Sequence, residues 1–277
     1  MAKKKVGIVG YGNMGSAIAE GIKGDYTVLV FDKDTGKTAP AKEMKTARSL
    51  EELLAGADIV VLAVKPQELG EVLERVKDGV GGKLVVSIAA GIPTSLFEER
   101  LGGGCRVVRA MPNLPAKVGK GMICFCAGKN AGEDDLGDAA GIFSFIGRVM
   151  RVDESMMDAV TAVSGSGPGY LYFLLEQARK EEWISIASGR FTAELSSAAE
   201  SVGFSPQDAA FLASATAEGS MALLASSGVS PEVLRAQVTS RGGTTEAGIN
   251  AMKSSGNSLK EAVKAALKRA RELSTAP

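Results

Sequence analysis

Hydrophobic positions in the first half of the chain fall into short continuous runs that alternate with amphipathic stretches. Short runs of β-branched and aliphatic residues predict buried strands, and apolar positions at helical spacing predict helices packed on a sheet. This alternation predicts a doubly wound α/β domain with ligand groups at the carboxyl ends of its parallel strands. Strands are expected at 6–9, 27–31, 58–64, 83–88, 106–110, 122–127 and 149–152, and helices at 16–23, 50–55, 67–76 and 133–145.

Beyond residue 153 the strand pattern disappears and helix boundaries dominate. Ser205 and Ser230 each precede a proline, the order typical of an N-cap followed by a first-turn proline. The helix expected over 206–226 is rich in small residues, which suits either close packing within one chain or a subunit interface. The sequence therefore predicts an α/β domain over residues 1–153 and an all-helical domain over residues 154–277.

The first apolar run leads into a glycine-rich turn, Gly10-Tyr11-Gly12-Asn13-Met14-Gly15. A GxGxxG spacing between a strand and a helix is the pattern of a dinucleotide-binding turn. Gly10 permits the turn, Gly12 lets a pyrophosphate approach the backbone, and Gly15 lets the helix pack closely on the strand. Free N–H groups at the helix N-terminus would then face the anion. Taken alone, the pattern is also compatible with glycines that serve packing only.

A carboxylate, Asp32, follows the second strand, about 20 residues beyond the glycines. At this position it can accept hydrogen bonds from the ribose of an adenine dinucleotide, and it would repel a 2′-phosphate. The nearby Lys33 and Lys37 could offset that repulsion. The sequence therefore leaves the choice between NADPH and NADH open, and acceptance of either is expected.

Two glycine-rich segments interrupt the helical half, Ser164–Tyr170 and Thr239–Thr245. Such segments are ordinary turns between helices. Each also places hydroxyl groups and free N–H donors where a helix begins, which is what a small carboxylate needs. Because the chain carries no net charge, local donors of this kind have to hold any anionic ligand.

Composition excludes several classes of function. The 32 basic and 32 acidic residues balance, so nothing in the charge indicates nucleic acid or an anionic membrane as a partner. The chain has no histidine, which excludes histidine-based triads, general bases and metal sites. The three cysteines have neither disulfide nor metal spacing, so we expect buried thiols and no metal. No apolar run appears long enough to span a membrane and no signal peptide is evident, so a cytoplasmic protein is expected.

Several segments together resemble the pyrroline-5-carboxylate reductase family, which catalyses the last step of proline biosynthesis. The resemblance covers nearly the whole chain in the right order. Members of the family have a Rossmann-like amino-terminal domain and a helical carboxyl-terminal domain through which subunits pair, so the resemblance implies a homodimer or a higher homo-oligomer. It rests on the Gly10–Gly15 turn, Ala63-Val64-Lys65-Pro66, Ser87-Ile88-Ala89-Ala90-Gly91, Arg109-Ala110-Met111-Pro112-Asn113, Ser164–Tyr170 and Thr239–Thr245.

The resemblance implies hydride transfer from NADPH or NADH to the C=N carbon of 1-pyrroline-5-carboxylate, which gives L-proline. A protonated imine is already electrophilic, so the protein mainly has to align donor and acceptor and hold the carboxylate. Thr245, whose hydroxyl would reach the ring nitrogen, and Lys65 are the expected catalytic residues, although Lys65 could also be a solvated surface lysine. Together with Asp32 and Lys33, the expected cofactor contacts are Gly10, Tyr11, Gly12, Asn13, Met14, Gly15, Ala63, Val64, Lys65, Pro66 and Asn113. The expected substrate contacts are Ser164, Ser166, Gly167, Pro168, Gly242, Gly243, Thr244 and Thr245.

The chain departs from the family pattern in several places. Arg241 stands where the family usually has proline, and Leu114 stands where threonine is usual. The stretch from Ala178 to Leu195, which holds the only tryptophan, has no counterpart in the pattern. Its length equals about five helical turns and would extend a helix without rotating its downstream face, whereas Ser188-Gly189 favours a break. We expect this stretch to protrude or to enlarge the subunit interface.

Two other functions stay open on sequence grounds. One is a reductase of another small cyclic imine or of a hydroxyacid; the hydroxyacid enzymes rely on a lysine in their helical domain. The Thr239–Thr245 segment argues against it. The other is a non-catalytic dinucleotide-sensing module, which would bind the cofactor through the same glycine turn and ignore proline. Arg241 and the unmatched stretch are compatible with this second alternative.

Overall fold

The computed structural model describes residues 3–39, 41 and 43–274. The chain forms two compact units. Unit 1 comprises Met1–Ala110 and Phe125–Glu154, and unit 2 comprises Met111–Cys124 and Ser155–Pro277. The chain therefore enters unit 2 briefly after residue 110, returns to unit 1, and enters unit 2 again at residue 155.

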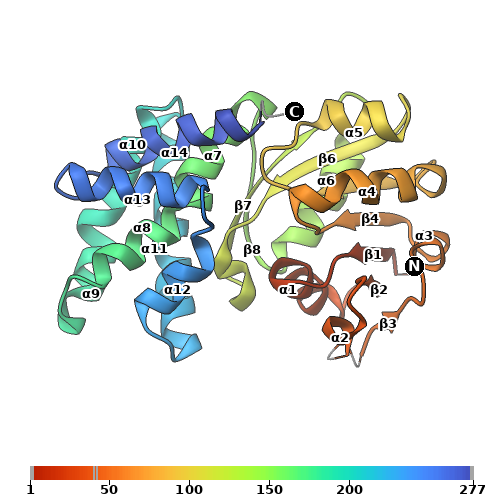
Figure 1. The fold of residues 1–277 in the computed structure, drawn as a ribbon, viewed down its shortest axis with the longest axis horizontal. Helices are drawn as coiled ribbons and strands as arrows, with labels where there is room; N and C mark the ends of the chain where they lie inside the picture. The colour runs from red at the N-terminus through yellow and green to blue at the C-terminus, as the bar shows by residue number, and fades with distance from the viewer. Residues whose placement is uncertain (1–2, 40, 42, 275–277) are drawn as a thin grey trace. The chain divides into compact units, whose positions relative to one another are not determined.

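Eight strands form one sheet in the order β3-β2-β1-β4-β5-β6-β7-β8 (Figure 1). Neighbouring strands from β3 to β6 pair in parallel, which confirms the doubly wound α/β prediction. The runs expected to be strands are all strands, and a short strand, β3, was not predicted. The strands are β1 Lys5–Val9, β2 Thr27–Phe31, β3 Lys45–Thr46, β4 Ile59–Leu62, β5 Leu84–Ser87, β6 Arg106–Met111, β7 Gly121–Ala127 and β8 Gly147–Arg151.

The strand order reverses between β1 and β4, and the candidate cofactor site described below lies at this reversal. Val9 at the end of β1 pairs with Phe31 at the end of β2 and with Leu62 at the end of β4. The carboxyl ends of these strands are therefore level with one another. In doubly wound sheets the crevice at such a reversal is where ligands bind.

The helices of unit 1 bury the sheet. Helix α4 packs against both α3 and α5, and the apolar faces of the three helices share a core with Val9, Leu62 and Val85 on one face of the sheet. Leu53 and Phe97, from α3 and α5, are completely buried in that core. The helices are α1 Asn13–Ile22, α2 Thr35–Thr38, α3 Leu50–Gly56, α4 Pro66–Val76, α5 Thr94–Leu101 and α6 Glu133–Ser144.

Unit 2 is built from helices, apart from Met111 at the end of β6 and the first residues of β7 (Figure 1). The longest of its described helices, α11, has the predicted caps. The Ser205 hydroxyl accepts a hydrogen bond from the Asp208 N–H, Pro206 is the first helical residue, and Gly228 ends the helix with φ of 68°. The helices of unit 2 are α7 Met157–Val160, α8 Gly167–Leu175, α9 Trp183–Ser185, α10 Thr192–Glu200, α11 Pro206–Ser227, α12 Pro231–Val238, α13 Thr244–Ser254 and α14 Leu259–Ser274.

Small residues on α11 serve packing within the chain. A Cβ atom at Gly219 would lie 2.1 Å from the Lys120 carbonyl oxygen, so only glycine allows this approach.

By length and hydropathy α11 would pass as a membrane span, contrary to the expectation that no apolar run is long enough. However, 56% of its most apolar window is buried inside the protein, which is typical of a core helix.

The stretch from Ala178 to Leu195 is largely helical. It runs through a 3₁₀ turn at Lys180–Glu182, then α9, and then a π-helical turn at Ile186–Phe191 that continues into α10. The break expected at Ser188-Gly189 is wrong, because both residues lie inside the π turn, whose Ala187 and Phe191 are buried. The chain instead leaves helical geometry at Ala178 and Arg179, just after α8.

Candidate active site

The glycine turn after β1 has the conformation that the sequence predicts. Gly10 has φ of 97°, and a Cβ atom there would lie 2.6 Å from the Ala63 carbonyl oxygen. A Cβ atom at Gly15 would lie 1.9 Å from the Gly10 carbonyl oxygen, whereas one at Gly12 would meet no atom within 4 Å. Gly10 and Gly15 are therefore required by the protein's own packing, and Gly12 leaves the backbone open to a ligand.

Helix α1 begins directly after Gly12 and has no side-chain cap. The Gly12 carbonyl accepts the first intrahelical hydrogen bond, from the Ser16 N–H. The N–H groups of Asn13, Met14 and Gly15 lie in the first turn, where a helix has no internal acceptors to offer. Such an uncapped helix start suits an anion such as a pyrophosphate.

A cavity of about 130 Å³ lies beside this turn and brings together residues from the ends of β1, β2 and β4. It includes the reversal of strand order, as expected for a nucleotide crevice. Of the residues predicted to contact a cofactor, the cavity is lined by Gly10, Gly12, Asp32, Lys33, Ala63, Val64 and Lys65. Tyr11, Asn13 and Pro66 are sequence neighbours of lining residues, and Met14 and Gly15 lie in the first turn of α1. None of these five residues lines the cavity itself.

One wall of the cavity was missed in the sequence. It consists of α4 residues Glu68, Glu71, Val72 and Arg75. These positions have the spacing of a single helix face, and the face begins one turn after Lys65. The sequence contained a signal for them, because a helix that starts directly after Lys65 has to present one of its faces to the ligand that Lys65 contacts.

Asp32 is held in place by the glycine turn itself. Its Oδ2 accepts a hydrogen bond of 2.8 Å from the Tyr11 N–H, and its Oδ1 accepts one of 2.9 Å from the Asp34 N–H. The side chain is only 8% exposed. Asp32 thus fixes the glycine turn while its carboxylate lines the cavity, a structural role that the sequence did not reveal.

The Tyr11 side chain connects the same turn to α1. Its hydroxyl donates to Glu20 on α1 at 3.2 Å. Burial, and secondarily the charge of Glu20, raise the pKa of Tyr11 to about 12. Tyr11 therefore stays a neutral donor at physiological pH.

In unit 2 the two glycine-rich segments come together through three hydroxyl groups. The Thr245 hydroxyl donates to Ser166 Oγ at 3.1 Å, and Ser166 Oγ also lies 3.0 Å from Thr244 Oγ1. Ser166 is 1% exposed and Thr245 is 4% exposed. We call Ser166, Thr244 and Thr245 the hydroxyl cluster. Its members were predicted from separate segments to contact one substrate.

The first of these segments is not the turn that the sequence predicted. Thr161–Gly165 form a π-helical turn, in which the Ser166 N–H bonds to the Thr161 carbonyl, and α8 starts at Gly167. Glycines here allow close packing: a Cβ atom at Gly167 would lie 2.7 Å from Thr216 Cγ2, and one at Gly169 would lie 2.4 Å from Thr245 Cγ2. Serine and glycine therefore occur here because the helices approach closely.

Ser164 and Asn113 are joined within unit 2. The Asn113 amide donates to the Ser164 carbonyl at 3.0 Å, and its Oδ1 accepts from the Met122 N–H at 2.8 Å. Ser164 is fully buried, and its own hydroxyl bonds to the Val160 carbonyl. The Asn113 side chain is therefore engaged in holding the chain between β6 and β7, and its contact with a cofactor stays a prediction.

The second segment forms the start of α13. Gly243 is the N-cap and lacks a side-chain cap, so the first-turn N–H groups of Thr244 and Thr245 suit a carboxylate. Gly242 has φ of 70° and is held at both ends, because its N–H donates to Glu246 at 2.7 Å and its carbonyl accepts from Arg269 at 2.7 Å. Arg241 is exposed.

The described part of unit 2 places neither a buried lysine nor a group of metal ligands beside the hydroxyl cluster. Over residues 155–274, every lysine is exposed, so the described part of unit 2 offers no buried lysine to the hydroxyl cluster. Within the described residues no group of histidine, cysteine and acidic side chains could hold a metal ion. Cys124 and Cys126 are buried as expected, and Cys105 is half-buried. Burial raises the pKa of Cys126 to about 12, so its thiol is protonated.

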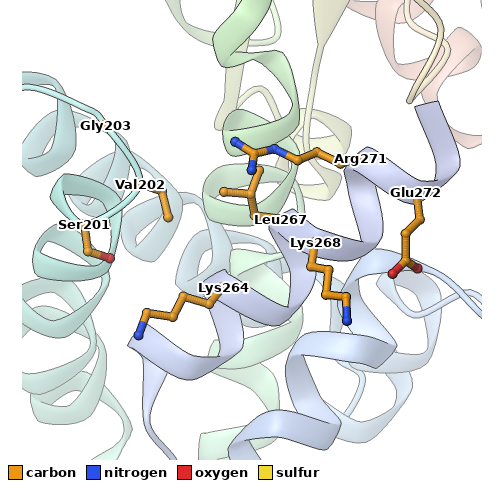
Figure 2. Close-up of a pocket in the computed structure, with 8 residues that line it drawn as sticks. All are labelled: Ser201, Val202, Gly203, Lys264, Leu267, Lys268, Arg271 and Glu272. Atoms are coloured by element: carbon orange, nitrogen blue, oxygen red, sulfur yellow. The ribbon is translucent and has the colours of Figure 1, made fainter. Parts of the chain in front are cut away.

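A larger open hollow in unit 2 contains none of the predicted site residues. Figure 2 shows it between the end of α10 and the side of α14, where Lys264, Lys268 and Arg271 follow one helix. These are surface cations on a solvated face, and Lys264 is paired with Glu261 at 3.0 Å. This hollow has no feature of a substrate pocket.

Comparison with known proteins decides the family. Residues 189–273 match the family model described as pyrroline-5-carboxylate reductase dimerisation, and residues 5–91 match the model described as NADP oxidoreductase, coenzyme F420-dependent. A pyrroline-5-carboxylate reductase from Methanosarcina acetivorans is 36% identical, and the alignment covers 92% of this chain and 92% of that protein. The chain belongs to the pyrroline-5-carboxylate reductase family. A family member from Arabidopsis thaliana is 33% identical over 98% of this chain and 95% of its own.

Solved structures of pyrroline-5-carboxylate reductases share the fold. The structure from Coxiella burnetii is 31% identical, with a TM-score of 0.66, and covers 99% of this chain and 100% of that one. The structure from Plasmodium falciparum, solved with NADP bound, is 29% identical with a TM-score of 0.64 and has the same coverage. The chain therefore has the Rossmann-like amino-terminal domain and the helical carboxyl-terminal region that the sequence predicted.

Proposed function

We propose that this chain reduces 1-pyrroline-5-carboxylate to L-proline with NADPH or NADH, as the last step of proline biosynthesis. Relatives that cover most of its length carry the name of that enzyme. The observation that carries the proposal is the hydroxyl cluster, in which Ser166, Thr244 and Thr245 meet at the uncapped start of α13. This arrangement offers both a carboxylate site and a hydroxyl for a ring nitrogen.

The cofactor half of the site would lie in unit 1. The reduced nicotinamide, when bound, supplies the hydride. The open backbone at Gly12 and the uncapped start of α1 fit a pyrophosphate. Ala63, Val64, Lys65 and Pro66, at the end of β4, would flank the nicotinamide half, and Lys65 would add a positive charge there. Asn113 belongs to unit 2, and its contact with the same group stays a prediction from the family resemblance.

The substrate half would lie in unit 2. Backbone N–H groups of Gly243, Thr244 and Thr245 would receive the carboxylate of the imino acid, and the helix dipole favours that negative charge. Gly242 would hold the segment in shape through its bonds to Glu246 and Arg269. Ser164, Ser166, Gly167 and Pro168 would form the opposite wall.

Thr245 is the residue that we propose next to the reacting atoms. Its hydroxyl already donates to Ser166, and an oxygen that donates one hydrogen bond keeps lone pairs for an N–H of the substrate. When the imine binds protonated, hydride adds to carbon, the C=N electron pair moves to nitrogen, and the nitrogen keeps its proton. This balance needs no general acid, in agreement with a chain that lacks histidine.

The test is transfer of label. With NADH or NADPH that carries deuterium at both positions of the nicotinamide C4, and with unlabelled imine, the proposal predicts proline that carries one deuterium at the former imine carbon, detected by mass spectrometry. Proline without deuterium, or no proline, would refute it. Excess unlabelled proline should also quench or shift the fluorescence of bound cofactor, which a dinucleotide sensor would not show.

We also infer that residues 1–153 serve the cofactor and residues 154–277 serve substrate binding and assembly into a cytoplasmic homodimer or larger homo-oligomer. An apolar groove supports a contact with a second copy, because one of its walls, from Met221 to Glu232, lies inside the dimerisation match. The other wall includes Trp183 and Ile184, and Ile184 is 74% exposed.

Sedimentation of an Ile184→Glu variant tests that assembly. A charge at this position should shift the protein toward monomer, while Phe145→Glu, at an exposed apolar position outside the dimerisation match, should not. Equal behaviour of both variants and the parent would place the interface elsewhere. A hydroxyacid reductase is not favoured, because the described lysines of unit 2 are exposed.

A further inference from the structure

The carboxylate of Asp32 cannot move out of the cavity without a cost. Both of its oxygens accept backbone N–H groups, from Tyr11 at 2.8 Å and from Asp34 at 2.9 Å, and the side chain is almost fully buried. Turning the carboxylate away would leave the Tyr11 N–H, in the middle of the glycine turn, without its acceptor. Unmade hydrogen bonds of buried backbone groups are unfavourable. The negative charge therefore stays where β2 ends.

The two lysines beside Asp32 are already engaged with acids. Lys33 Nζ lies 2.6 Å from Glu68 Oε1 on α4, and Lys37 Nζ lies 3.6 Å from Asp32 Oδ1 itself. All four of these residues line the same cavity. The charges of these four residues sum to zero, so each lysine next to Asp32 is balanced by an acid, although Lys65, Glu71 and Arg75 also line the cavity.

We propose that this chain binds NADH in preference to NADPH, with Asp32 as the residue that sets the preference and Glu68 as the residue that keeps Lys33 from a 2′-phosphate. A carboxylate at the end of the second strand bonds the free ribose hydroxyls of NADH. A 2′-phosphate brings a further charge of about −1.5 to −2 beside a carboxylate that cannot withdraw. This proposal deepens the proposed function and concerns only its cofactor.

Direct binding, measured without the imine, tests the proposal independently of turnover. Dissociation constants for NADH and for NADPH are obtained by titrating the full-length protein and following nicotinamide fluorescence. We expect the parent protein to bind NADH about 10-fold more tightly than NADPH. Equal binding, or tighter binding of NADPH, would overturn the proposal while leaving the reductase function intact.

Single substitutions separate the contributions of Asp32 and Glu68 to the cofactor preference. Asp32→Asn keeps an oxygen for one N–H but removes the charge, so the ratio of the two dissociation constants should fall toward one. Glu68→Gln should release Lys33 and strengthen NADPH binding about two- to fivefold, the range of an exposed ion pair. Glu74→Gln is the matched control, because Glu74 lies on the same helix, pairs with Lys77 at 3.0 Å and does not line the cavity.

The pattern across these variants decides the mechanism. A shift toward NADPH in Glu68→Gln but not in Glu74→Gln supports the specific pairing of Lys33. Equal shifts in both variants would show that only the overall charge of α4 matters and would overturn the role of Glu68. The melting temperature of each variant shows whether it is folded. A folded Asp32→Asn protein with the parent's ratio of NADPH to NADH dissociation constants would overturn the role of Asp32.

Discussion

The Thr245 hydroxyl oxygen lies 3.1 Å from that of Ser166, although 79 positions of sequence separate the two residues. Helix α13 carries one and the segment before α8 carries the other. Close approach is possible because Gly169 lies directly beneath the Thr245 methyl group. The contact joins two segments that were each, by themselves, compatible with ordinary turns.

Replacing Thr245 tests what this contact does. Thr245→Val removes the hydroxyl at nearly constant volume, so we expect kcat/KM for the imine to fall about 10- to 100-fold with cofactor affinity unchanged. Thr245→Ser should recover much of the activity. Thr239→Val is the control, because the Thr239 hydroxyl donates to the Arg235 carbonyl one turn earlier and lies outside the hydroxyl cluster. A Thr245→Val enzyme with parental kinetics would remove Thr245 from the site.

Two glycines of the same turn should respond oppositely to alanine. At Gly12 a Cβ atom meets nothing within 4 Å and φ is −80°, so Gly12→Ala should fold normally and bind NADH about 10-fold more weakly. At Gly15 a Cβ atom would lie 1.9 Å from a backbone oxygen, so Gly15→Ala should lose about 3 kcal/mol of stability or more. Thermal unfolding and cofactor titration of both proteins check this contrast. It fails if Gly12→Ala binds like the parent.

A glycine on α13 should be required for packing. A Cβ atom at Gly248 would lie 2.5 Å from the ring of Tyr170, which is fully buried, so Gly248→Ala should destabilise unit 2 by about 1–3 kcal/mol. Gly137→Ala is the matched change on an exposed face of α6, where a Cβ atom meets nothing, and it should stabilise by about 0.5–1 kcal/mol. Denaturant unfolding distinguishes the two, and equal effects would contradict the packing argument.

Burial of tyrosine predicts alkaline instability. Desolvation raises the pKa values of Tyr170 and Tyr172 well above the ordinary value of 10.0, and their hydroxyls donate to the carbonyls of Ala162 and Ser220. Above pH 10 the unfolded chain loses these phenolic protons while the folded chain keeps them. Stability should therefore be complete below pH 10 and fall as the pH rises further.

Absorbance of tyrosinate checks that prediction. Ionisation of Tyr170 and Tyr172 should appear only together with the loss of helical circular dichroism. Ionisation of all tyrosines near pH 10 in a protein that is still folded would contradict it. Tyr170→Phe should unfold less steeply with pH, at a cost of about 1 kcal/mol for the lost hydrogen bond.

Local patterns predicted much of the fold, because the burial of parallel strands on both faces makes each one a continuous apolar run. The same patterns placed Gly10, Asp32 and Lys65 at strand ends, and the structure brings these residues to one cavity. The hydrogen bond from the Tyr11 N–H to Asp32 could not be predicted from the sequence, because it depends on how the ends of two strands align in space. The α4 wall was missed for the same reason.

Glycine and serine were misleading where tertiary packing decides the conformation. Ser164–Tyr170 has the composition of a turn, yet it is helical and buried, since its glycines lie against Thr216 and Thr245. Ser188-Gly189 likewise lies in a helical turn held by the burial of Ala187 and Phe191. Propensity favours a turn at both places, and contacts with distant helices override it.

Oxidation of NADH and of NADPH, followed by the loss of nicotinamide absorbance with and without 1-pyrroline-5-carboxylate, tests the central claim most directly. We predict oxidation that depends on the imine and forms one L-proline for each cofactor consumed, with NADH the better donor at low concentration. A protein that binds either cofactor but oxidises neither in the presence of the imine would contradict the claim that this chain is a reductase.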